Sequence, residues 1–191
     1  MPIHLVLGGA RSGKTRFAEE GALMQANQLT LPACYVATGV RTDEEMEQRI
    51  ETHQATRSQL FETVERPRGL AQWLTDGATQ EPAVLLIDCL ATYLGTLLFD
   101  AGETLSQSLL LAQGVKLLEA FAAYPYPLWV VSNEVGMGIV PAYASTRLYR
   151  DVLGRLNSEL AQVAHDVTFL VAGLPMPLKR RGRVCAPAVE E

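Results

Sequence analysis

Residues 8–15 have the types and spacing that could hold a polyphosphate. They read Gly-Gly-Ala-Arg-Ser-Gly-Lys-Thr and match the complete GxxxxGK[ST] pattern. In that pattern glycines let backbone N–H groups turn toward phosphates, a following helix N-terminus adds partial positive charge, the lysine adds a mobile charge, and the threonine hydroxyl binds Mg²⁺. We predict a nucleotide-binding loop here, the alternative being a glycine-rich turn without a ligand. Its members are Gly8, Gly9, Ala10, Arg11, Ser12, Gly13, Lys14 and Thr15.

An acidic residue follows a second apolar run. Residues 84–88 read Val-Leu-Leu-Ile-Asp, and in phosphate-loop enzymes an aspartate at such a strand end holds Mg²⁺, directly or through water. Taken alone, it would be interpreted as a helix cap or a loop residue. We expect Thr15 and Asp88 to share a Mg²⁺ site. Because ligands bind beyond the carboxyl ends of strands in such sheets, residues 37–39 and 132–134 are expected on the same rim, as site contacts or as plain turns.

A histidine lies between two arginines on a predicted helix over residues 43–57. Arg49, His53 and Arg57 are spaced four residues apart, so they are neighbours on one side of the helix. The arginines could hold a phosphate chain while the imidazole attacks it. The alternative, which spacing alone favours, is an exposed face with a Glu45–Arg49 ion pair. For His4 and His165, we expect structural roles.

Apolar runs alternate with segments of helical period along the chain. This alternation predicts an α/β fold with a mostly parallel sheet flanked by helices. The predicted strands are residues 4–7, 34–37, 84–87, 128–131 and 167–171. The predicted helices are residues 13–28, 43–57, 70–75, 105–122 and 145–164.

The bulk composition limits the classes of function. The chain has 191 residues and a formal net charge of −5, which favours one domain (residues 1–191) and gives no general attraction to nucleic acid. No apolar run approaches the length of a membrane span, and we expect no signal peptide. The three cysteines are widely spaced, which favours a reducing compartment, the cytoplasm, and argues against zinc. Residues 180–191 are expected to form a flexible tail; its basic run is a solvated end or a phosphate contact.

Residues 8–19, which read Gly-Gly-Ala-Arg-Ser-Gly-Lys-Thr-Arg-Phe-Ala-Glu, resemble the bifunctional adenosylcobinamide kinase/adenosylcobinamide-phosphate guanylyltransferase family. The resemblance extends over about residues 3–179, nearly the whole chain, and further segments agree in the same order. The block at residues 131–141, Val-Ser-Asn-Glu-Val-Gly-Met-Gly-Ile-Val-Pro, is unusually specific. The other agreeing segments are residues 35–39, 45–57, 63–65, 86–90, 149–157 and 171–175, with Lys179.

The resemblance implies a bifunctional transferase of cobalamin biosynthesis. Such an enzyme phosphorylates the aminopropanol hydroxyl of adenosylcobinamide with ATP or GTP, then transfers GMP from GTP to that phosphate, releasing pyrophosphate. It further implies Mg²⁺, a RecA-like P-loop NTPase fold, a homotrimer, and His53 as the residue that becomes guanylylated. The nucleotide-contacting positions that it implies outside the loop are Ala37, Thr38, Gly39, Gln54, Ala55, Thr56, Arg57, Glu65 and Asp88.

Four positions depart from the family pattern. Gln54 and Ser58 stand where arginine and proline are frequent, and Tyr93 and Thr96 stand where tryptophan and asparagine are usual. If residues 91–97 contact the corrinoid, we expect the substrate preference of this protein to differ from that of other family members. We therefore treat the kinase activity as a question separate from the guanylyl transfer.

Two other functions compete with the bifunctional enzyme. The first is a P-loop kinase for another small alcohol, with His53 structural. The second is a GTP-dependent switch that binds partner proteins. The switch is disfavoured because the chain has no Asn-Lys-x-Asp motif for reading guanine.

Overall fold

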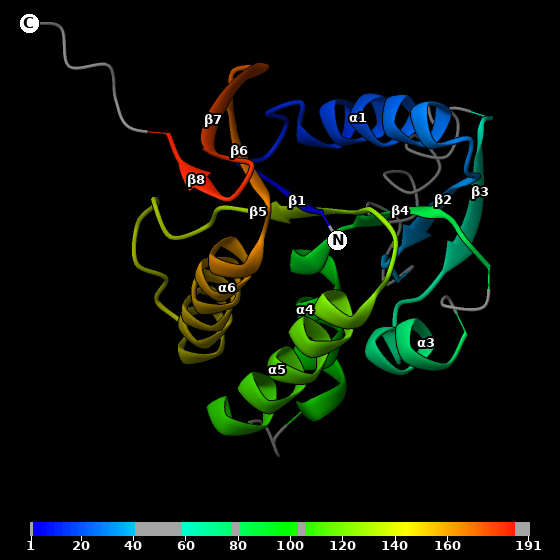
Figure 1. Ribbon diagram of the computed structural model, residues 1–191. Helices are drawn as coiled ribbons and strands as arrows, with labels where there is room; N and C mark the ends of the chain where they lie inside the picture. Colours follow the sequence, from blue (N-terminus) through cyan, green and yellow to red (C-terminus); the bar gives the residue numbers. More distant parts are fainter. Residues whose placement is uncertain (1, 41–58, 78–80, 103–105, 186–191) are drawn as a thin grey trace, which may run out of the picture.

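The computed structural model describes residues 2–40, 59–77, 81–102 and 106–185. They form one eight-stranded sheet in the order β3-β2-β4-β5-β1-β6-β7-β8 (Figure 1). The pairs from β3 to β6 are parallel, and β7 and β8 are antiparallel additions at one edge. The strands are β1 Ile3–Gly8, β2 Ala33–Ala37, β3 Phe61–Glu65, β4 Val84–Asp88, β5 Leu128–Asn133, β6 Asp166–Val171, β7 Leu174–Arg180 and β8 Arg183–Val184.

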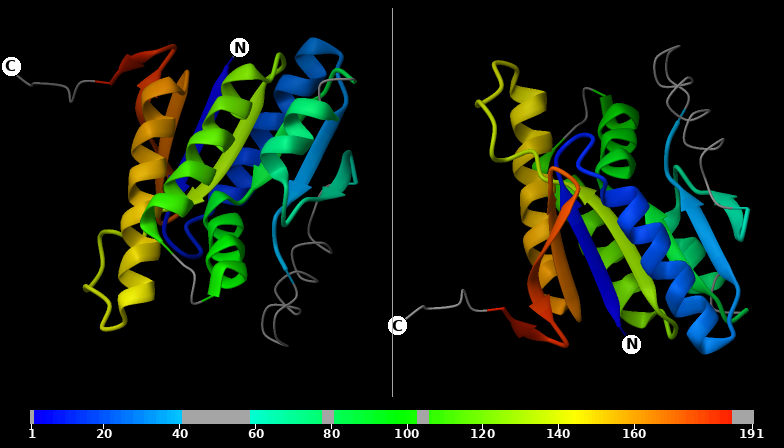
Figure 2. Two further views of the ribbon diagram at one scale, coloured as in Figure 1. Left: turned by 90° about the horizontal axis from the view of Figure 1, so that it is seen from below. Right: turned by 90° about the horizontal axis from the view of Figure 1, so that it is seen from above.

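Helices cover both faces of the sheet. The described helices are α1 Lys14–Leu29, α3 Leu70–Asp76, α4 Leu90–Ala101, α5 Gln107–Ala123 and α6 Ala144–Val163. Figure 2 shows α1 across one face and the other four across the opposite face. The side of α1 toward the sheet carries small residues, Ala18, Ala22 and Ala26, which allow the helix to lie close to the strands. Gly21 continues this close approach, because a Cβ there would lie 2.2 Å from the ring of Trp129.

The core runs along the central strands. Leu86 and Ile87 in β4 and Val130 and Val131 in β5 are fully buried. Each is flanked by another buried apolar residue, since both surfaces of the sheet are covered by helices. This is the near-continuous apolar run that a parallel strand requires.

The α/β sheet predicted from the alternation of patterns is confirmed. Each predicted strand is present, and the described helices that were predicted begin and end within two residues of expectation. The predicted helix over residues 43–57 lies outside the described residues. The strands β3, β7 and β8 and the helix α4 were not predicted from the sequence. The last two also change the expected tail, because Arg180 ends β7 and Arg183–Val184 form β8; residues 186–191 lie outside the described part.

Candidate nucleotide site

The phosphate loop joins the end of β1 to the start of α1. Its backbone is held on two sides, because the carbonyl of Gly8 accepts a hydrogen bond from Glu134 N–H (3.2 Å) and that of Ser12 accepts one from Gly173 N–H (3.1 Å). Gly13, the residue before the helix, provides no side-chain cap. The backbone of the loop is therefore fixed by its neighbours.

Two glycines in the loop are required for different reasons. A Cβ on Gly8 would lie 2.4 Å from Ser12 Oγ and 2.9 Å from the carbonyl oxygen of Leu170, so no larger residue fits. Gly13 has a φ of 87°, a left-handed conformation that glycine adopts without steric cost. The close turn of the loop therefore depends on both positions.

The charged end of Lys14 lies over the loop. Its Nζ donates a hydrogen bond to the carbonyl oxygen of Gly9 at 3.1 Å. An ammonium group on a flexible stem can exchange such a contact for a phosphate oxygen, because it acts as a mobile point charge. This position is suited to binding the outer phosphates of a nucleotide.

Thr15 and Asp88 meet at the carboxyl edge of the sheet. Thr15 lies in the first turn of α1, which follows β1, and Asp88 ends β4, with β5 between the two strands. Thr15 Oγ1 donates to Asp88 Oδ2 at 3.2 Å. The same oxygen accepts a hydrogen bond from the hydroxyl of Tyr35 at 2.5 Å. Two residues that lie 73 positions apart in sequence are thereby brought into one polar group.

This pair fits the ligand chemistry of Mg²⁺, which prefers oxygen donors and keeps several waters and phosphates in its shell. A hydroxyl and a carboxylate are present together. Among residues 2–40, 59–77, 81–102 and 106–185, no three His, Cys, Asp or Glu side chains cluster closely enough to form a metal cage.

The ends of β2 and β3 form the next part of the rim. Ala37 and Glu65 are in register, and the Glu65 side chain is exposed. Thr38 is fully buried, and its hydroxyl donates to the Cys89 carbonyl oxygen (2.8 Å) and accepts from the Cys89 N–H (2.7 Å). The Thr38 side chain therefore fixes β2 to the end of β4, and the half-buried Gly39 follows it.

A buried polar chain supports the end of β5. Ser132 Oγ donates to Asn157 Oδ1 at 2.7 Å, and Asn157 Nδ2 donates to the Asn133 carbonyl oxygen at 3.0 Å. Asn157 comes from α6, so this helix is tied directly to the edge beside the phosphate loop. Sequence reasoning placed residues 132–134 on the rim but missed Asn157 as their support.

The thiol beside Asp88 is not a candidate nucleophile. Cys89 is buried, and its Sγ accepts a hydrogen bond from Thr92 N–H at the start of α4. Burial, together with the charge of Asp88, raises the pKa of the Cys89 thiol. The thiol is therefore kept protonated, which suits a helix cap and not attack on phosphorus.

Five candidate positions from the sequence lie outside the described residues. They are His53, Gln54, Ala55, Thr56 and Arg57. The positions that the structure does bring together are the phosphate loop and Asp88, with Ala37, Thr38, Gly39 and Glu65 along the neighbouring strand ends. Two of the departures from the family pattern, Tyr93 and Thr96, are buried in α4, where they are 6% and 8% exposed.

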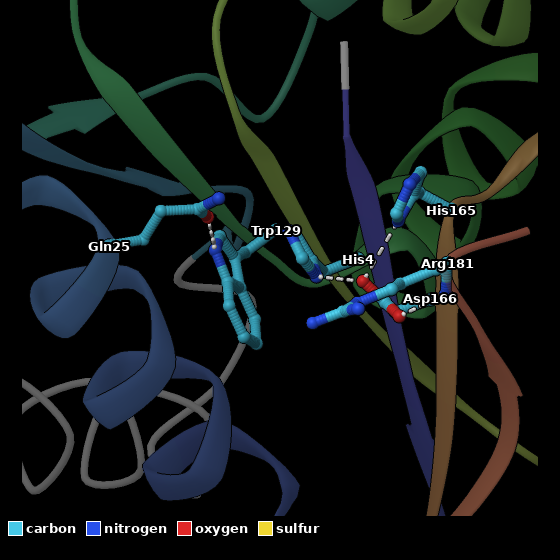
Figure 3. Close-up of polar contacts among 6 residues, drawn as sticks. All are labelled: His4, Gln25, Trp129, His165, Asp166 and Arg181. Atoms are coloured by element: carbon cyan, nitrogen blue, oxygen red, sulfur yellow. Dashed lines mark hydrogen bonds and ion pairs between the residues drawn. The ribbon is translucent and has the colours of Figure 1, made fainter. Parts of the chain in front are cut away.

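A second polar cluster lies at the opposite, amino edge of the sheet (Figure 3). Asp166 Oδ2 is 3.1 Å from His4 Nδ1 and 3.2 Å from His165 Nδ1, and Arg181 N–H donates to its other oxygen. The His4 ring stacks on Trp129. A cavity of about 680 Å³ lies here. The contacts tie β1, β5, β6 and the β7–β8 turn together, far from the phosphate loop at the other ends of the strands.

A family model described as cobinamide kinase / cobinamide phosphate guanyltransferase matches residues 4–178. The chain belongs to this family. It is 41% identical over 176 residues to the bifunctional adenosylcobalamin biosynthesis protein CobP of Pseudomonas aeruginosa, covering 92% of this chain and 96% of that protein. It is 37% identical over 185 residues to the bifunctional adenosylcobalamin biosynthesis protein CobU of Escherichia coli K12, covering 92% and 98%. The resemblance found in the sequence is thus confirmed, and with it the two transferase activities of the family.

Solved structures agree on the fold. The flagellar accessory protein FlaH from Methanocaldococcus jannaschii has a TM-score of 0.52 at 15% identity, with 94% of this chain and 79% of that chain covered. A protein from Pyrococcus horikoshii OT3 has a TM-score of 0.50 at 11% identity, covering 99% and 94%. These similarities concern the RecA-like α/β fold alone. No helix in the described part of the chain is both long and apolar enough to cross a membrane.

Proposed function

We propose that the protein carries out both steps of its family, on adenosylcobinamide and then on its phosphate. In the first step the aminopropanol hydroxyl attacks the γ-phosphorus of ATP or GTP. The bond between the β- and γ-phosphates breaks, a nucleoside diphosphate leaves, and the hydroxyl proton passes to solvent. Lys14 and the backbone of the loop hold the phosphates during this displacement.

In the second step a nitrogen of the His53 imidazole attacks the α-phosphorus of GTP, and pyrophosphate leaves. The phosphate of adenosylcobinamide phosphate then attacks the same phosphorus, the P–N bond breaks, and free histidine returns with adenosylcobinamide-GDP as product. We assign the nucleotide contacts beyond the loop to Ala37–Gly39, Gln54–Arg57 and Glu65. The resemblance at these positions supports the assignment.

We assign Mg²⁺ to the pair Thr15 and Asp88, directly or through water. A bound Mg²⁺ supplies positive charge that offsets the charge of the phosphates and of the leaving group. The convergence of the Thr15 hydroxyl and the Asp88 carboxylate at 3.2 Å, at the end of the complete phosphate-loop pattern, is the observation that carries this proposal. A structural helix cap alone would not require the complete phosphate-loop pattern next to it.

Removing the lysine charge tests the nucleotide site. We expect Lys14→Ala to weaken GTP binding by at least tenfold and to abolish turnover, because a charge-assisted contact to the phosphates is lost. Lys116→Ala, which removes an exposed lysine from α5, serves as the control. If Lys14→Ala bound GTP and turned over like the parent protein, the proposed site would be wrong.

The histidine step has its own test. Incubation with α-labelled GTP should leave an acid-labile, base-stable label on the protein, and His53→Ala should remove that label. His165→Ala, which removes an exposed histidine at the opposite edge, should keep it. Label retained by His53→Ala would favour another nucleophile, while kinase activity without any label would favour the simple kinase.

We further propose that the protein is a cytoplasmic homotrimer. Exposed apolar side chains on the loop before α6 support self-association, since Met137 is 80% exposed and Ile139 is 96% exposed. Figure 1 shows this loop, drawn in yellow, standing out from the sheet. The cysteines Cys34, Cys89 and Cys185 are free thiols, which supports a reducing compartment.

A further inference from the structure

We propose that Tyr35 is a positioning residue for the metal–nucleotide site, acting through the carboxylate of Asp88. Its hydroxyl holds Oδ2 of Asp88, so that the carboxylate is oriented before the nucleotide and its cation arrive. The proposal rests on the function proposed above for Asp88, and it adds a residue of β2 to the machinery at the end of β4.

The hydrogen bonds at Asp88 carry the argument. The Tyr35 hydroxyl donates to Oδ2 at 2.5 Å, and the Thr15 hydroxyl donates to the same oxygen at 3.2 Å. A hydroxyl bonded to an ionised oxygen forms a charge-assisted hydrogen bond, roughly twice as strong as a neutral one. Both donors therefore engage Oδ2 and leave Oδ1 for a cation or its water.

The surroundings of Tyr35 make it a rigid donor. The residue is 2% exposed, and its ring packs edge-on against Phe61 of β3, with the ring centres 5.8 Å apart. In the β2–β4 register Tyr35 lies opposite Leu86, and Ala37 lies opposite Asp88. The phenol thus reaches from the middle of the sheet to its carboxyl edge, where its buried ring keeps the hydroxyl in place at little further cost in conformational entropy.

The buried Tyr124 and the partly buried Tyr149 use a different kind of acceptor. Tyr124 donates to the carbonyl oxygen of Ala83 at 2.8 Å, and Tyr149 donates to that of Ala91 at 3.0 Å. These bonds satisfy a buried hydroxyl with the backbone, which is the ordinary structural solution. Tyr35 instead engages an ionisable side chain at the proposed site. This difference makes Tyr124 the matched control.

Binding of Mn²⁺, as a substitute for Mg²⁺, separates a positioning role from a structural one. With GTP present, free Mn²⁺ is followed by electron paramagnetic resonance during a titration. We expect Tyr35→Phe to weaken Mn²⁺ binding about tenfold, the effect of losing one charge-assisted hydrogen bond. GTP affinity in EDTA should stay within about twofold of the parent value. In turnover, the half-saturating Mg²⁺ concentration should rise while the rate at saturating Mg²⁺ recovers.

Tyr124→Phe loses an equally buried hydroxyl and should leave Mn²⁺ affinity unchanged. All variants are measured at a temperature where circular dichroism shows each of them folded, so that lower stability is not mistaken for lost positioning. An unchanged Mn²⁺ affinity in Tyr35→Phe would overturn the proposal. So would an equal loss in Tyr124→Phe, because the effect would then belong to the core in general.

Asp88→Asn distinguishes this proposal from the one on which it rests. If Asp88→Asn weakens Mn²⁺ binding and Tyr35→Phe does not, the metal site stands and the role of Tyr35 is refuted. If neither substitution changes Mn²⁺ binding, the assignment of Asp88 itself is wrong. Weakening in both, with a smaller effect for Tyr35→Phe, is the expected result.

Discussion

At the scale of single residues, His4 is a histidine kept uncharged by its surroundings. Burial lowers its pKa from 6.5 to about 4, against the opposing charge of Asp166. Below pH 6.5 the His4 imidazole is therefore protonated in the unfolded chain, whereas in the folded protein it is protonated only below about pH 4. The contribution of His4 to the free energy of unfolding is fully present above pH 6.5 and is lost as the pH falls from 6.5 to about 4.

We predict that lowering the pH from 7.5 to 5 costs the parent protein up to about 2 kcal/mol of unfolding free energy through His4. The substitution His4→Phe keeps an aromatic ring against Trp129 and removes the titration, so its loss over the same interval should be smaller by that amount. Urea unfolding at the two pH values measures both quantities. An identical loss in the two proteins would show that His4 does not control this pH dependence.

Asn157 is the centre of the polar chain behind the phosphate loop, and it is 4% exposed. Asn157→Ala would leave both the Ser132 hydroxyl and the Asn133 carbonyl without this partner. We predict a loss of roughly 2–4 kcal/mol in unfolding free energy, and a smaller loss of about 1 kcal/mol for Ser132→Ala. In the double variant the two effects should be less than additive, because the residues share one bond. Additive effects would argue against a shared network.

The sequence was sufficient for the local part of the site and not for its supports. The phosphate loop is read from eight adjacent residues, and Asp88 from the apolar run before it. Tyr35 reaches Asp88 across 53 positions, and Ser132 meets Asn157 across 25. Such contacts depend on strand order and register, which no spacing within one segment encodes. A tyrosine inside an apolar run is otherwise ordinary core.

At the scale of elements, α5 and α6 pack through a glycine. A Cβ on Gly114 of α5 would lie 2.2 Å from Cδ2 of Leu156, which is 2% exposed in α6. We predict that Gly114→Ala destabilises the protein by about 1–2 kcal/mol, because overpacking outweighs the gain in helix propensity. By contrast, a Cβ added to Gly154 of α6 would have no neighbouring atom within 4 Å. Gly154→Ala should therefore be neutral or stabilising by about 0.5–1 kcal/mol in urea unfolding. A stabilised Gly114→Ala would show that the helices separate without cost.

The elements missed by sequence reasoning share physical causes. The helix α4 contains Thr92, Gly95 and Thr96, residues of low helix propensity, within a short and mostly apolar segment. The strand β7 contains Pro175 and Pro177, which normally argue against a strand. The two prolines are tolerated here because β7 pairs antiparallel near the edge of the sheet.

At the scale of the whole molecule, the order of strands explains how the site is assembled. Placing β5 between β1 and β4 sets the phosphate loop and Asp88 one strand apart. Their parallel directions bring both to the same edge. The strand β7 runs antiparallel to β6 and therefore ends at the opposite edge, where its turn into β8 lies next to Asp166. The fold thus places the candidate nucleotide site and the His4–Asp166–His165 cluster at opposite edges of the sheet.

The exposed apolar loop before α6 gives the assembly proposal a direct test. We expect the parent protein to sediment at about three times the 20.8 kDa of one chain, with Ile139 buried between copies. A charge at position 139 would have to be desolvated at the interface without a partner. We therefore expect Ile139→Asp to weaken the affinity between subunits by at least tenfold. Phe99→Asp, at a side chain that is 76% exposed on α4, is the control and should leave the mass unchanged. A monomeric parent protein would refute the trimer. Dissociation by Phe99→Asp but not by Ile139→Asp would move the interface to the α4 face, where a charged residue would meet the neighbouring copy instead.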